Sequence, residues 1–372
     1  MPRTGVFLAL PLAIALLVCG CTAFRISDPH RRLDPPQLQD QLRTDRPSSV
    51  ELNTEKLTDL ITSIENDKHK DLNSVLIARN GTLVMEAYFN GETRDTLHDI
   101  RSAGKSITAT LVGIAIHDGF IDSIDQRVLG FFPEYLPLRN KDPRKRKITI
   151  RYLLTMRSGF HANDRDSSTP GNEGRMTQSN DWIKYSLNVP MKYPPGQNWR
   201  YAGMNTLLLS GIVRMATSMP VDKYLEIRLL KPLGIENYFW KKTPMNRVVG
   251  QGNLFLRPRD MLKVGLLFLK NGVWNGMQIV PASWIHESTQ PHTLLGQDAF
   301  TGYGYQWWTK QFILNDKSIP YFYASGNGGQ RITVIPKLQM VVVITSSAYG
   351  ERRGHTRSDD ILKAIFSSVD AR

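Results

Sequence analysis

The chain has 372 residues, of which 41% are hydrophobic and 22% are charged, and these fractions are ordinary for a globular protein. The composition therefore excludes a disordered chain and a fibre of the collagen or coiled-coil type. Only two cysteines occur, Cys19 and Cys21, which excludes a disulfide framework and a cysteine-based zinc site. The length is sufficient for a large hydrophobic core in one or two domains.

The formal net charge of +13 raises the question of a nucleic-acid partner. The basic residues are scattered along the chain, however, and only residues 141–147 (KDPRKRK) form a dense cluster. We interpret this cluster as a solvated loop. We therefore expect no nucleic-acid partner and at most a weak attraction to anionic surfaces.

The N-terminus is typical of a secretory signal. Arg3 precedes an apolar run over residues 6–18, which is too short for a comfortable membrane span. The run ends in VCGC at 18–21, which resembles a bacterial lipobox and implies that Cys21 carries lipid. An ordinary cleaved signal peptide with a chance cysteine is the open alternative. We predict a signal peptide over residues 1–20 and a lipid-anchored protein of the cell envelope.

Residues 21–50 differ from the rest of the chain because they are polar, rich in proline and without an apolar period. Such a segment is semi-extended in its proline-rich parts. We therefore predict a lipidated tether over residues 21–50 and a folded body over residues 51–372.

Two strand-like runs and one apolar helix are predicted near the start of the body. Residues 74–79 and 82–89 flank Asn80-Gly81, a dipeptide that strongly favours a hairpin turn. After Ser102, a stretch that continues to His117 has helical spacing and is apolar on nearly every side. A helix with this pattern is expected to be buried.

The middle and the end of the body differ in their predicted structure. Helices are predicted from apolar periods over residues 150–155, 205–216 and 258–269, and residues 160–200 are rich in loop-forming proline and glycine. The last third has an aromatic stretch, two β-branched strands and a closing helix, at residues 303–309, 332–335, 340–345 and 359–367. The aromatic residues are expected to be mostly core, although they could also wall a cleft.

Strands are thus predicted at both ends of the body, with helices between them. The economical arrangement is an α/β fold with one antiparallel sheet, flanked by helices, that is assembled from residues 51–120 and 270–372. A mainly helical part, residues 121–269, is inserted between these two segments.

Ser102-Ala103-Gly104-Lys105 forms an S-x-x-K tetrapeptide at the start of the buried helix. Residues three apart on a helix share a face, so the hydroxyl and the ammonium can meet. We expect burial and the helix N-terminus to push Lys105 toward its neutral, proton-accepting form, as an activated serine nucleophile requires. Roughly one chance S-x-x-K is expected in a chain of this length, and the apolar helix that follows favours the functional interpretation.

The tetrapeptide is part of the first of three segments that appear in order along the chain. The stretch IRSAGKSI at 100–107 contains the tetrapeptide, PG at 195–196 precedes YAGMNT at 201–206, and SGNGGQ stands at 325–330. With these segments, residues 74 to 345 resemble the serine hydrolases of the class C β-lactamase family. That family includes penicillin-binding peptidases, carboxylesterases and 6-aminohexanoate-dimer hydrolase, and the resemblance implies a β-lactamase/transpeptidase-like fold.

The resemblance implies a role for each motif. Ser102 would be the nucleophile, and Lys105 and Tyr201 would relay its proton, although a tyrosine at a helix start is more often core. The backbone N–H groups of Ser102 and Asn327 would form the oxyanion hole, with Gly328 as the alternative donor after a one-residue slip.

The third motif would also bind the substrate through Ser325 and Gly326. Two positions depart from the pattern of β-lactamases in this family: Gly203 stands where they have asparagine, and Ala324 stands where they have lysine or histidine. The missing groups normally help to bind the β-lactam amide and carboxylate. The pattern is therefore closer to the esterase and amide-hydrolase branch.

We predict a serine hydrolase that acts through an acyl-enzyme on a small-molecule ester, amide or peptide substrate, without a cofactor or a metal. A β-lactamase or D-amino-acid peptidase is one alternative, and a non-catalytic cell-envelope binding module is another. The lipid anchor would hold the catalytic domain to a membrane, on its periplasmic or extracellular side.

Overall fold

A computed structural model describes residues 1–2 and 33–369 of the chain. The predicted lipidation site Cys21, most of the predicted signal peptide and the first part of the predicted tether lie outside the described residues. Within the described part of the chain, no helix is long and apolar enough to cross a membrane.

Nine strands form one sheet, in the order β1-β3-β2-β14-β13-β12-β11-β10-β9. Neighbouring strands are antiparallel, apart from the parallel pair of β1 and β3. The strands are β1 (Arg43–Thr44), β2 (Leu72–Arg79), β3 (Thr82–Tyr88), β9 (Thr293–Leu294), β10 (Gly302–Tyr303), β11 (Trp308–Leu314), β12 (Lys317–Gly326), β13 (Gln330–Ile335) and β14 (Met340–Ser346). The last strand, β14, pairs with β2, so the two ends of the body meet in the middle of the sheet, as predicted.

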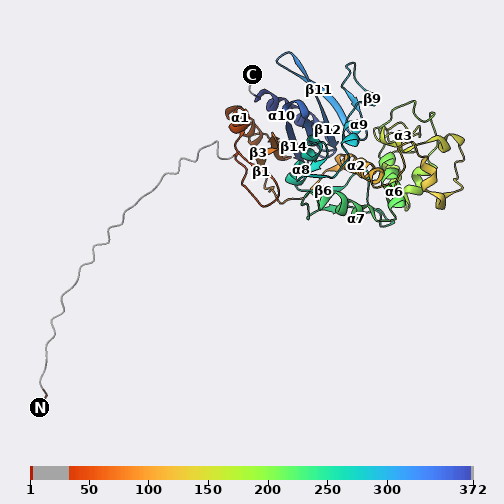
Figure 1. The fold of residues 1–372 in the computed structure, drawn as a ribbon, viewed down its shortest axis with the longest axis horizontal. Coiled ribbons are helices and arrows are strands. Elements are labelled where there is room, and N and C mark those ends of the chain that lie inside the picture. Colours follow the sequence, from red (N-terminus) through yellow and green to blue (C-terminus); the bar gives the residue numbers. More distant parts are fainter. Residues whose placement is uncertain (3–32, 370–372) are drawn as a thin grey trace.

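Helices cover both faces of this sheet (Figure 1). Helices α1 (Thr54–Glu65) and α10 (Arg352–Ser367) lie on one face, and α2 (Gly104–His117) and α8 (Pro258–Leu269) lie on the other. Strand β14 shows why both faces are filled: Val342 packs in the core under α1 and α10, whereas Val341 and Val343 pack in the core under α8. Side chains of a strand alternate between its faces, so this apolar run contributes to two cores.

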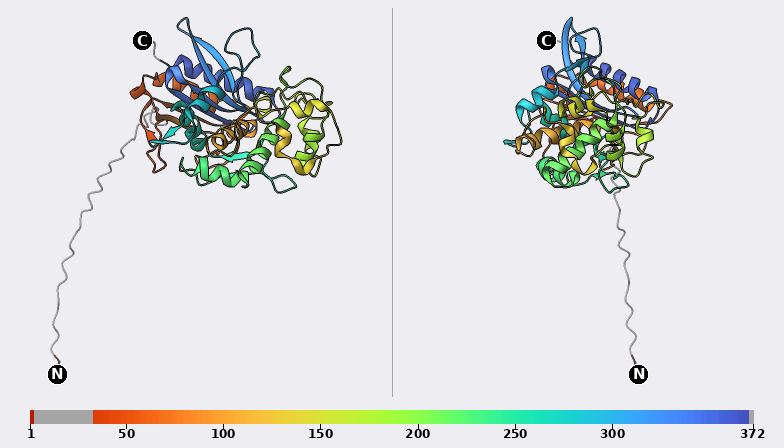
Figure 2. Two further views of the ribbon diagram at one scale, coloured as in Figure 1. Left: turned by 45° about the vertical axis from the view of Figure 1, so that its right-hand side comes forward. Right: turned by 90° about the vertical axis from the view of Figure 1, so that its right-hand side faces the viewer.

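A mainly helical part lies beside the sheet, to the right in Figure 1 and in the left view of Figure 2. Its α-helices are α3 (Ile150–Leu154), α4 (Glu173–Met176), α5 (Trp182–Asn188), α6 (Gly203–Thr217) and α7 (Val221–Leu225), and a π-helical turn follows over Glu226–Leu230. Helix α6 is central because α2, α3 and α5 all pack against it. Helix α8 belongs to the sheet instead, since it packs on β13 and β14, although the sequence grouped it with the helical part.

Short elements complete the described chain. Strands β4 (His98–Asp99), β6 (Leu254–Leu256) and β5 (Phe239–Trp240) form a small second sheet, β7 (Val273–Trp274) pairs with β8 (Met277–Gln278), and α9 spans Ala282–Ser288. Tight 3₁₀ turns occur at Pro47–Val50, Arg101–Ala103, Val128–Phe131, Pro133–Tyr135, Pro143–Lys147 and Pro336–Leu338.

The end of the predicted tether packs against the body. Residues 43–44 pair with β3, and the side chains of Leu33 and Leu42 are buried. Hydrophobic burial of this kind is worth about 1.5–3 kcal/mol for each large side chain. The folded body therefore includes residues 33–50, and only the part of the predicted tether before residue 33 stays a prediction.

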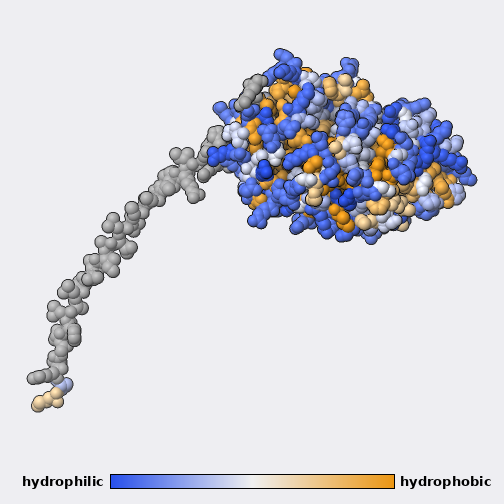
Figure 3. Space-filling model, viewed as in Figure 1, coloured by the Kyte–Doolittle hydropathy of each residue, from blue (hydrophilic) through white to orange (hydrophobic). Residues whose placement is uncertain are grey.

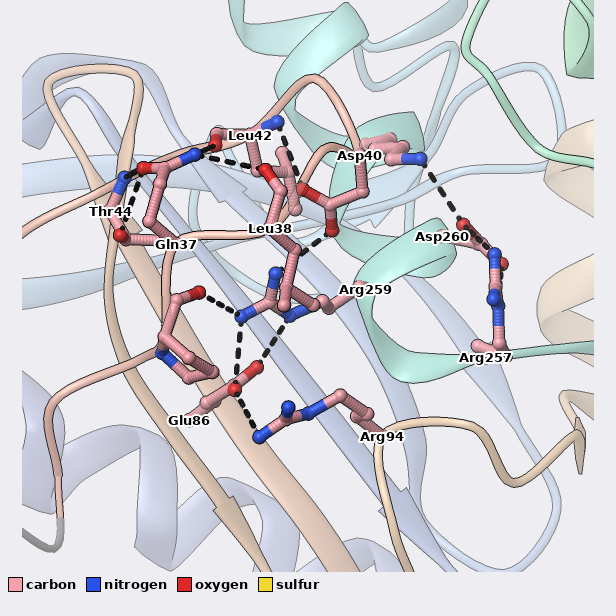
Figure 4. A network of polar contacts seen from close by, with 12 residues as sticks. Gln37, Leu38, Asp40, Leu42, Thr44, Glu86, Arg94, Arg257, Arg259 and Asp260 are labelled. Atoms are coloured by element: carbon pink, nitrogen blue, oxygen red, sulfur yellow. Dashed lines mark hydrogen bonds and ion pairs between the residues drawn. The ribbon is translucent and has the colours of Figure 1, made fainter.

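A buried arginine fastens this N-terminal segment (Figure 4). Arg259 of α8 is 4% exposed and donates to both carboxylate oxygens of Glu86 on β3, at 2.7 and 3.0 Å. The same guanidinium donates to Asp40 Oδ2 at 2.9 Å and to the Pro36 carbonyl at 3.0 Å. Charge-assisted bonds in a fork geometry are among the stronger polar contacts, so the segment is held firmly.

The basic cluster at residues 141–147 is only partly the solvated loop that the sequence predicts. Most of its side chains are exposed. The face of the molecule drawn in Figure 3 is mostly hydrophilic, with scattered hydrophobic patches. Lys145, however, is buried and donates from Nζ to the Leu187 carbonyl at 2.7 Å. Burial lowers the pKa of Lys145 to about 8. This lysine has a structural partner and is not available to an external anion.

Candidate active site

Ser102 and Lys105 meet at the start of α2. Ser102 lies in the 3₁₀ turn Arg101–Ala103, directly before the helix, and its side chain is partly exposed. Lys105 Nζ donates to Ser102 Oγ at 3.0 Å and to the Gln251 carbonyl at 2.7 Å. Lys105 is 1% exposed, because the apolar helix and the Gln251 loop enclose it. The structure therefore brings together the two residues that the S-x-x-K spacing paired.

The protonation state expected for Lys105 from the sequence is wrong. Burial acts to lower the pKa of Lys105, as predicted, but the charges of Tyr201, Glu173 and Asp164 outweigh it. The pKa therefore lies above its ordinary value, and the ammonium form is favoured. The expectation rested on burial and the helix N-terminus, whereas the carboxylates that raise the pKa come from a segment that is distant in the sequence.

One of these carboxylates, Asp164, occupies the space beside Gly203 together with Gln251. Asp164 Oδ2 accepts the Gly203 N–H at 2.5 Å, and Asp164 Oδ1 accepts the Glu173 N–H at 3.0 Å. Burial and the charge of Glu173 raise the pKa of Asp164 to about 6, while Lys105 acts against this rise. A β carbon at residue 203 would lie 3.1 Å from Gln251 Cγ and 3.2 Å from Asp164 Oδ2. Two other side chains thus fill the place where an asparagine side chain would stand.

Tyr201 is both a packing residue and a wall of the site. It precedes α6, and Lys105 Nζ lies 5.4 Å from the centroid of its ring. Trp308 stacks on Tyr201 at a centroid distance of 5.7 Å, and Tyr303 meets it edge-on at 6.3 Å. The aromatic stretch is thus divided as anticipated: Tyr303 is buried core, whereas Trp308 is partly exposed and lines the cleft.

A cavity of about 430 Å³ opens above Ser102. Its lining residues are Ser102, Asp164, Arg165, Glu173, Tyr201, Trp308, Tyr323, Ser325, Gly326, Asn327, Arg331 and His355. The cavity thus collects the predicted nucleophile, the predicted tyrosine and the predicted third motif from three separate parts of the chain. In the part of the chain that the structure describes, no cluster of side chains could hold a metal ion.

The third motif lies against the turn that carries Ser102. A β carbon at Gly326 would lie 2.1 Å from the Ile100 carbonyl oxygen, so only glycine allows this approach. Ser325 and Gly326 end β12, and the exposed Asn327 follows them into a tight turn. Asn327 is among the lining residues of the cavity.

Comparison with known proteins identifies the family. The family model described as Beta-lactamase matches residues 72–365. The chain belongs to the beta-lactamase family. The family resemblance seen in the sequence is thereby confirmed, and with it the assignment to a family of serine hydrolases.

Individual relatives are distant but cover most of the chain. The 6-aminohexanoate-dimer hydrolase of Paenarthrobacter ureafaciens is 24% identical over 328 residues, which are 80% of this chain and 78% of that protein. A penicillin-binding protein from Bacillus halodurans has a TM-score of 0.62 at 18% identity, over 82% of this chain and 98% of that one. A family VIII carboxylesterase also has a TM-score of 0.62 at 18% identity, over 83% and 97%. These structures confirm the predicted fold.

Arg331 is a residue of this beta-lactamase-family cleft that the sequence analysis missed. It stands opposite Ser325 in the β12–β13 pair, is 5% exposed and donates to Ser325 Oγ. Its guanidinium also contacts His355 Nδ1 at 3.3 Å and Asp359 Oδ1 at 3.3 Å, and it lies 4.9 Å from the centroid of the Tyr323 ring. Burial and the Arg331 charge lower the pKa of His355 to about 4, so the imidazole is neutral near pH 7.

This arginine bears on the departure from the family pattern at Ala324. Arg331 pairs with Ser325, the residue that follows Ala324. A cation is therefore present next to Ala324, but it comes from β13 and not from β12. The sequence carries a usable signal for it. The tight turn that follows Gly326 fixes the hairpin register and therefore pairs residue 325 with residue 331. Asp164, Glu173 and His355 carry no comparable signal, because loops and a distant helix position them.

Proposed function

We propose that this protein is a serine hydrolase that transfers an acyl group from an ester or amide to water through a covalent ester on Ser102. One observation carries the proposal: the 3.0 Å hydrogen bond from buried Lys105 to a serine hydroxyl at an open cavity. A nucleophile in contact with a group that can move its proton is the arrangement that covalent catalysis requires. The family membership supports the reaction class.

The first half of the reaction follows from the charges around Lys105. With Tyr201 as the phenolate, Lys105 passes one ammonium proton to the phenolic oxygen and takes the proton of Ser102 in its place. Ser102 Oγ then forms a bond to the substrate carbonyl carbon. Lys105 is an ammonium before and after this step, in agreement with its raised pKa. Tyr201 next returns its proton to the leaving group, and the bond between carbonyl carbon and leaving group breaks.

The second half of the reaction uses the same groups on water. Tyr201, which has lost its proton to the leaving group, accepts a proton from water, and the hydroxide adds to the acyl carbon. The ester bond to Ser102 then breaks. Lys105 donates a proton to Ser102 Oγ and takes the proton of Tyr201 in its place, and the carboxylic acid leaves. The oxyanion of each tetrahedral intermediate would lie between the backbone N–H groups of Ser102 and Asn327. Loss of one such donor typically costs about 100- to 1000-fold in rate.

The surroundings of Gly203 favour an ester or a simple amide over a β-lactam. Gln251 and Asp164 fill the space of the missing asparagine, so no amide side chain from that position faces the cavity. An unpaired polar group on a bound ligand costs about 1–3 kcal/mol. A β-lactam amide would meet such a cost here, whereas a short-chain ester has fewer polar groups to satisfy.

Labelling and a substrate panel test the proposal against its alternatives. A fluorophosphonate probe should label the intact protein at Ser102, and a non-catalytic binding module would not be labelled. The panel compares p-nitrophenyl acetate and butyrate, p-nitroanilide amides, D-amino-acid peptides and nitrocefin. We expect the highest kcat/KM for the short esters. A kcat/KM for nitrocefin equal to that for the esters would favour a β-lactamase, and preferential cleavage of D-amino-acid peptides would favour a peptidase.

We also propose that the protein is a lipid-anchored protein of the cell envelope. The support is the VCGC sequence at 18–21, after an apolar run and before a polar segment. A single acyl chain binds a membrane only marginally, so several chains on Cys21 would be needed for firm anchoring. Mass spectrometry of the mature N-terminus should find lipid on Cys21 and none in Cys21→Ser. An unmodified Cys21, or cleavage elsewhere, would refute this proposal.

A further inference from the structure

The residue before the proposed nucleophile has an unusual backbone conformation. Arg101 has a φ of 51°, in the left-handed region that residues other than glycine rarely adopt. The 3₁₀ turn begins at this residue, and Ser102 follows it directly. The contacts that hold Arg101 in this conformation therefore also fix the backbone position from which the Ser102 side chain extends.

Asp99 holds both the backbone and the side chain of Arg101. Asp99 Oδ1 accepts the Arg101 backbone N–H at 2.9 Å, and Asp99 Oδ2 lies 3.1 Å from Arg101 Nε. Asp99 is buried, and its Oδ2 also accepts from Asn253 Nδ2 at 2.8 Å. The carboxylate thereby joins the Ser102 turn to the loop whose Gln251 carbonyl accepts from Lys105.

Tyr349 joins the same turn to the opposite side of the cleft. The Arg101 guanidinium lies 4.4 Å from the centroid of the Tyr349 ring, and the Tyr349 hydroxyl donates to the Asp99 carbonyl at 3.4 Å. The Tyr349 ring also packs against the glycine turn that follows β12. A β carbon at Gly328 would lie only 2.9 Å from Tyr349 Cδ1. One ring thus touches both Arg101 and the turn that follows the third motif.

The glycine turn has a second connection to this region. The backbone N–H of Gly350 donates to Asn327 Oδ1 at 2.7 Å. The segment at residues 349–350 therefore contacts Asn327 and Gly328, the two candidate oxyanion donors, and Arg101, the neighbour of Ser102. Residues 349–350 therefore connect the turn that carries Ser102 to the turn that carries the candidate oxyanion donors.

We propose that Asp99, Arg101 and Tyr349 are positioning residues that hold Ser102 in register with the oxyanion hole; we name them the Arg101 clamp. This inference rests on the proposed function. None of the three side chains is among the lining residues of the cavity, so the clamp acts through Ser102 and the glycine turn. Its loss should slow the attack on the carbonyl and leave the binding of the ester unchanged.

Two variants remove contacts of the Arg101 clamp without introducing backbone strain. Arg101→Gly suits the left-handed φ, and Tyr349→Leu removes the ring. For p-nitrophenyl butyrate we expect each to lower kcat at least about tenfold, because small misplacements of reacting groups are costly, and to leave KM within about threefold. Tyr349→Phe keeps the ring and should retain kcat within about threefold.

A glycine placed elsewhere provides the matched control. Gln339 also has a left-handed backbone, with a φ of 48°, but it lies in the turn between β13 and β14, away from the cavity. Gln339→Gly should leave kcat and KM unchanged. Wild-type kcat in both Arg101→Gly and Tyr349→Leu would overturn the clamp, and so would an equal loss in Gln339→Gly.

A measurement without substrate separates failure of the clamp from failure of the proposed function. If the wild-type protein neither hydrolyses esters nor labels at Ser102, the proposed function is wrong. Hydrogen–deuterium exchange of residues 99–104 still tests the clamp. This segment should exchange at least about tenfold faster in Arg101→Gly and Tyr349→Leu than in the wild type and Gln339→Gly, because lost contacts raise local opening. Equal exchange rates in all four proteins would overturn the inference.

Discussion

The two walls of the cleft each contain one buried cation, but the positive charge is balanced in different ways. The first wall carries Ser102, Lys105 and Tyr201, and the second carries Ser325 and Arg331. On the first wall, Lys105 has a raised pKa because Tyr201, Glu173 and Asp164 outweigh its burial. On the second wall, Arg331 lies beside a neutral imidazole and a single, partly exposed carboxylate. An ammonium among acids can exchange protons with them, whereas a guanidinium keeps its proton. The first wall is therefore suited to proton transfer and the second to a fixed positive potential.

The comparison also shows why a buried lysine need not be neutral. Burial alone lowers the pKa of an amine, as Lys145 illustrates at about 8, where a single acidic residue, Asp142, acts against it. Lys105 is as deeply buried as Lys145, but its pKa is shifted in the opposite direction. The difference lies in the number and placement of acidic partners. The protonation state of a site lysine thus depends on residues that are remote in the sequence.

Removal of the nucleophile should have the largest effect on the first wall. Ser102→Ala should lower kcat/KM for p-nitrophenyl butyrate at least about 1000-fold and abolish fluorophosphonate labelling. The melting temperature should barely change, because the substitution removes a partly exposed hydroxyl and little packing. Esterase assays and a thermal melt of the purified protein check both statements. Full activity in Ser102→Ala would assign the chemistry to another residue.

Replacement of the lysine distinguishes a moving proton from a fixed charge. Lys105→Arg keeps a cation on the first wall but cannot release a proton, so it should be nearly as damaging as Lys105→Met, with a loss of about 100-fold or more in kcat. Single-turnover kinetics with a p-nitrophenyl ester measures the acylation step directly. Wild-type turnover in Lys105→Arg would mean that the two walls use their cations in the same way.

The second wall should affect substrate choice and not the chemical step. Arg331→Gln should lower kcat/KM for the anionic mono-p-nitrophenyl glutarate about tenfold, since a hydrogen bond to a charged group contributes about 1.5–3 kcal/mol and the cavity is open to water. The value for neutral p-nitrophenyl butyrate should stay within about threefold. Arg165→Gln, at an exposed arginine on the rim of the same cavity, is the matched control and should show a smaller change. Equal losses for both esters would indicate a structural role alone.

Elements and residues that depend on local interactions could be predicted from the sequence, whereas those that depend on contacts between distant segments could not. Helix α8 matches its predicted range of 258–269, because an apolar period and a terminal Asn-Gly define it locally. The S-x-x-K pair was predictable for the same reason. Helix α1 was missed although Leu57, Ile61 and Ile64 form an apolar face and Asn53 caps its first turn. This apolar period and this cap are local signals, so the helix could have been predicted from the sequence.

The rest of the site depends on contacts that no local pattern reveals. The acidic residues beside Lys105, Asp164 and Glu173, come from the loop-rich residues 160–200, where the only helices are the short α4 and α5 and neither residue belongs to an apolar period. The raised pKa of Lys105 therefore had no local sign, and the sequence-based expectation had the wrong direction. Arg331 was predictable in principle from the β12–β13 register, but only once both strands of that hairpin were recognised.

The smallest expected effect concerns stability and pH at the first wall. The pKa of Asp164 rises from 3.8 to about 6 because of burial and the charge of Glu173. The folded protein therefore binds more protons at this residue than the unfolded chain between about pH 4 and pH 6, and the free energy of unfolding falls as the pH rises through that range. Asp164→Asn has no such proton to lose. Relative to the wild type, its free energy of unfolding should rise by about 1–3 kcal/mol from pH 4 to pH 7 and be constant above pH 7. Urea unfolding at several pH values measures this difference, and a constant offset over the whole range would show that Asp164 does not titrate with a raised pKa.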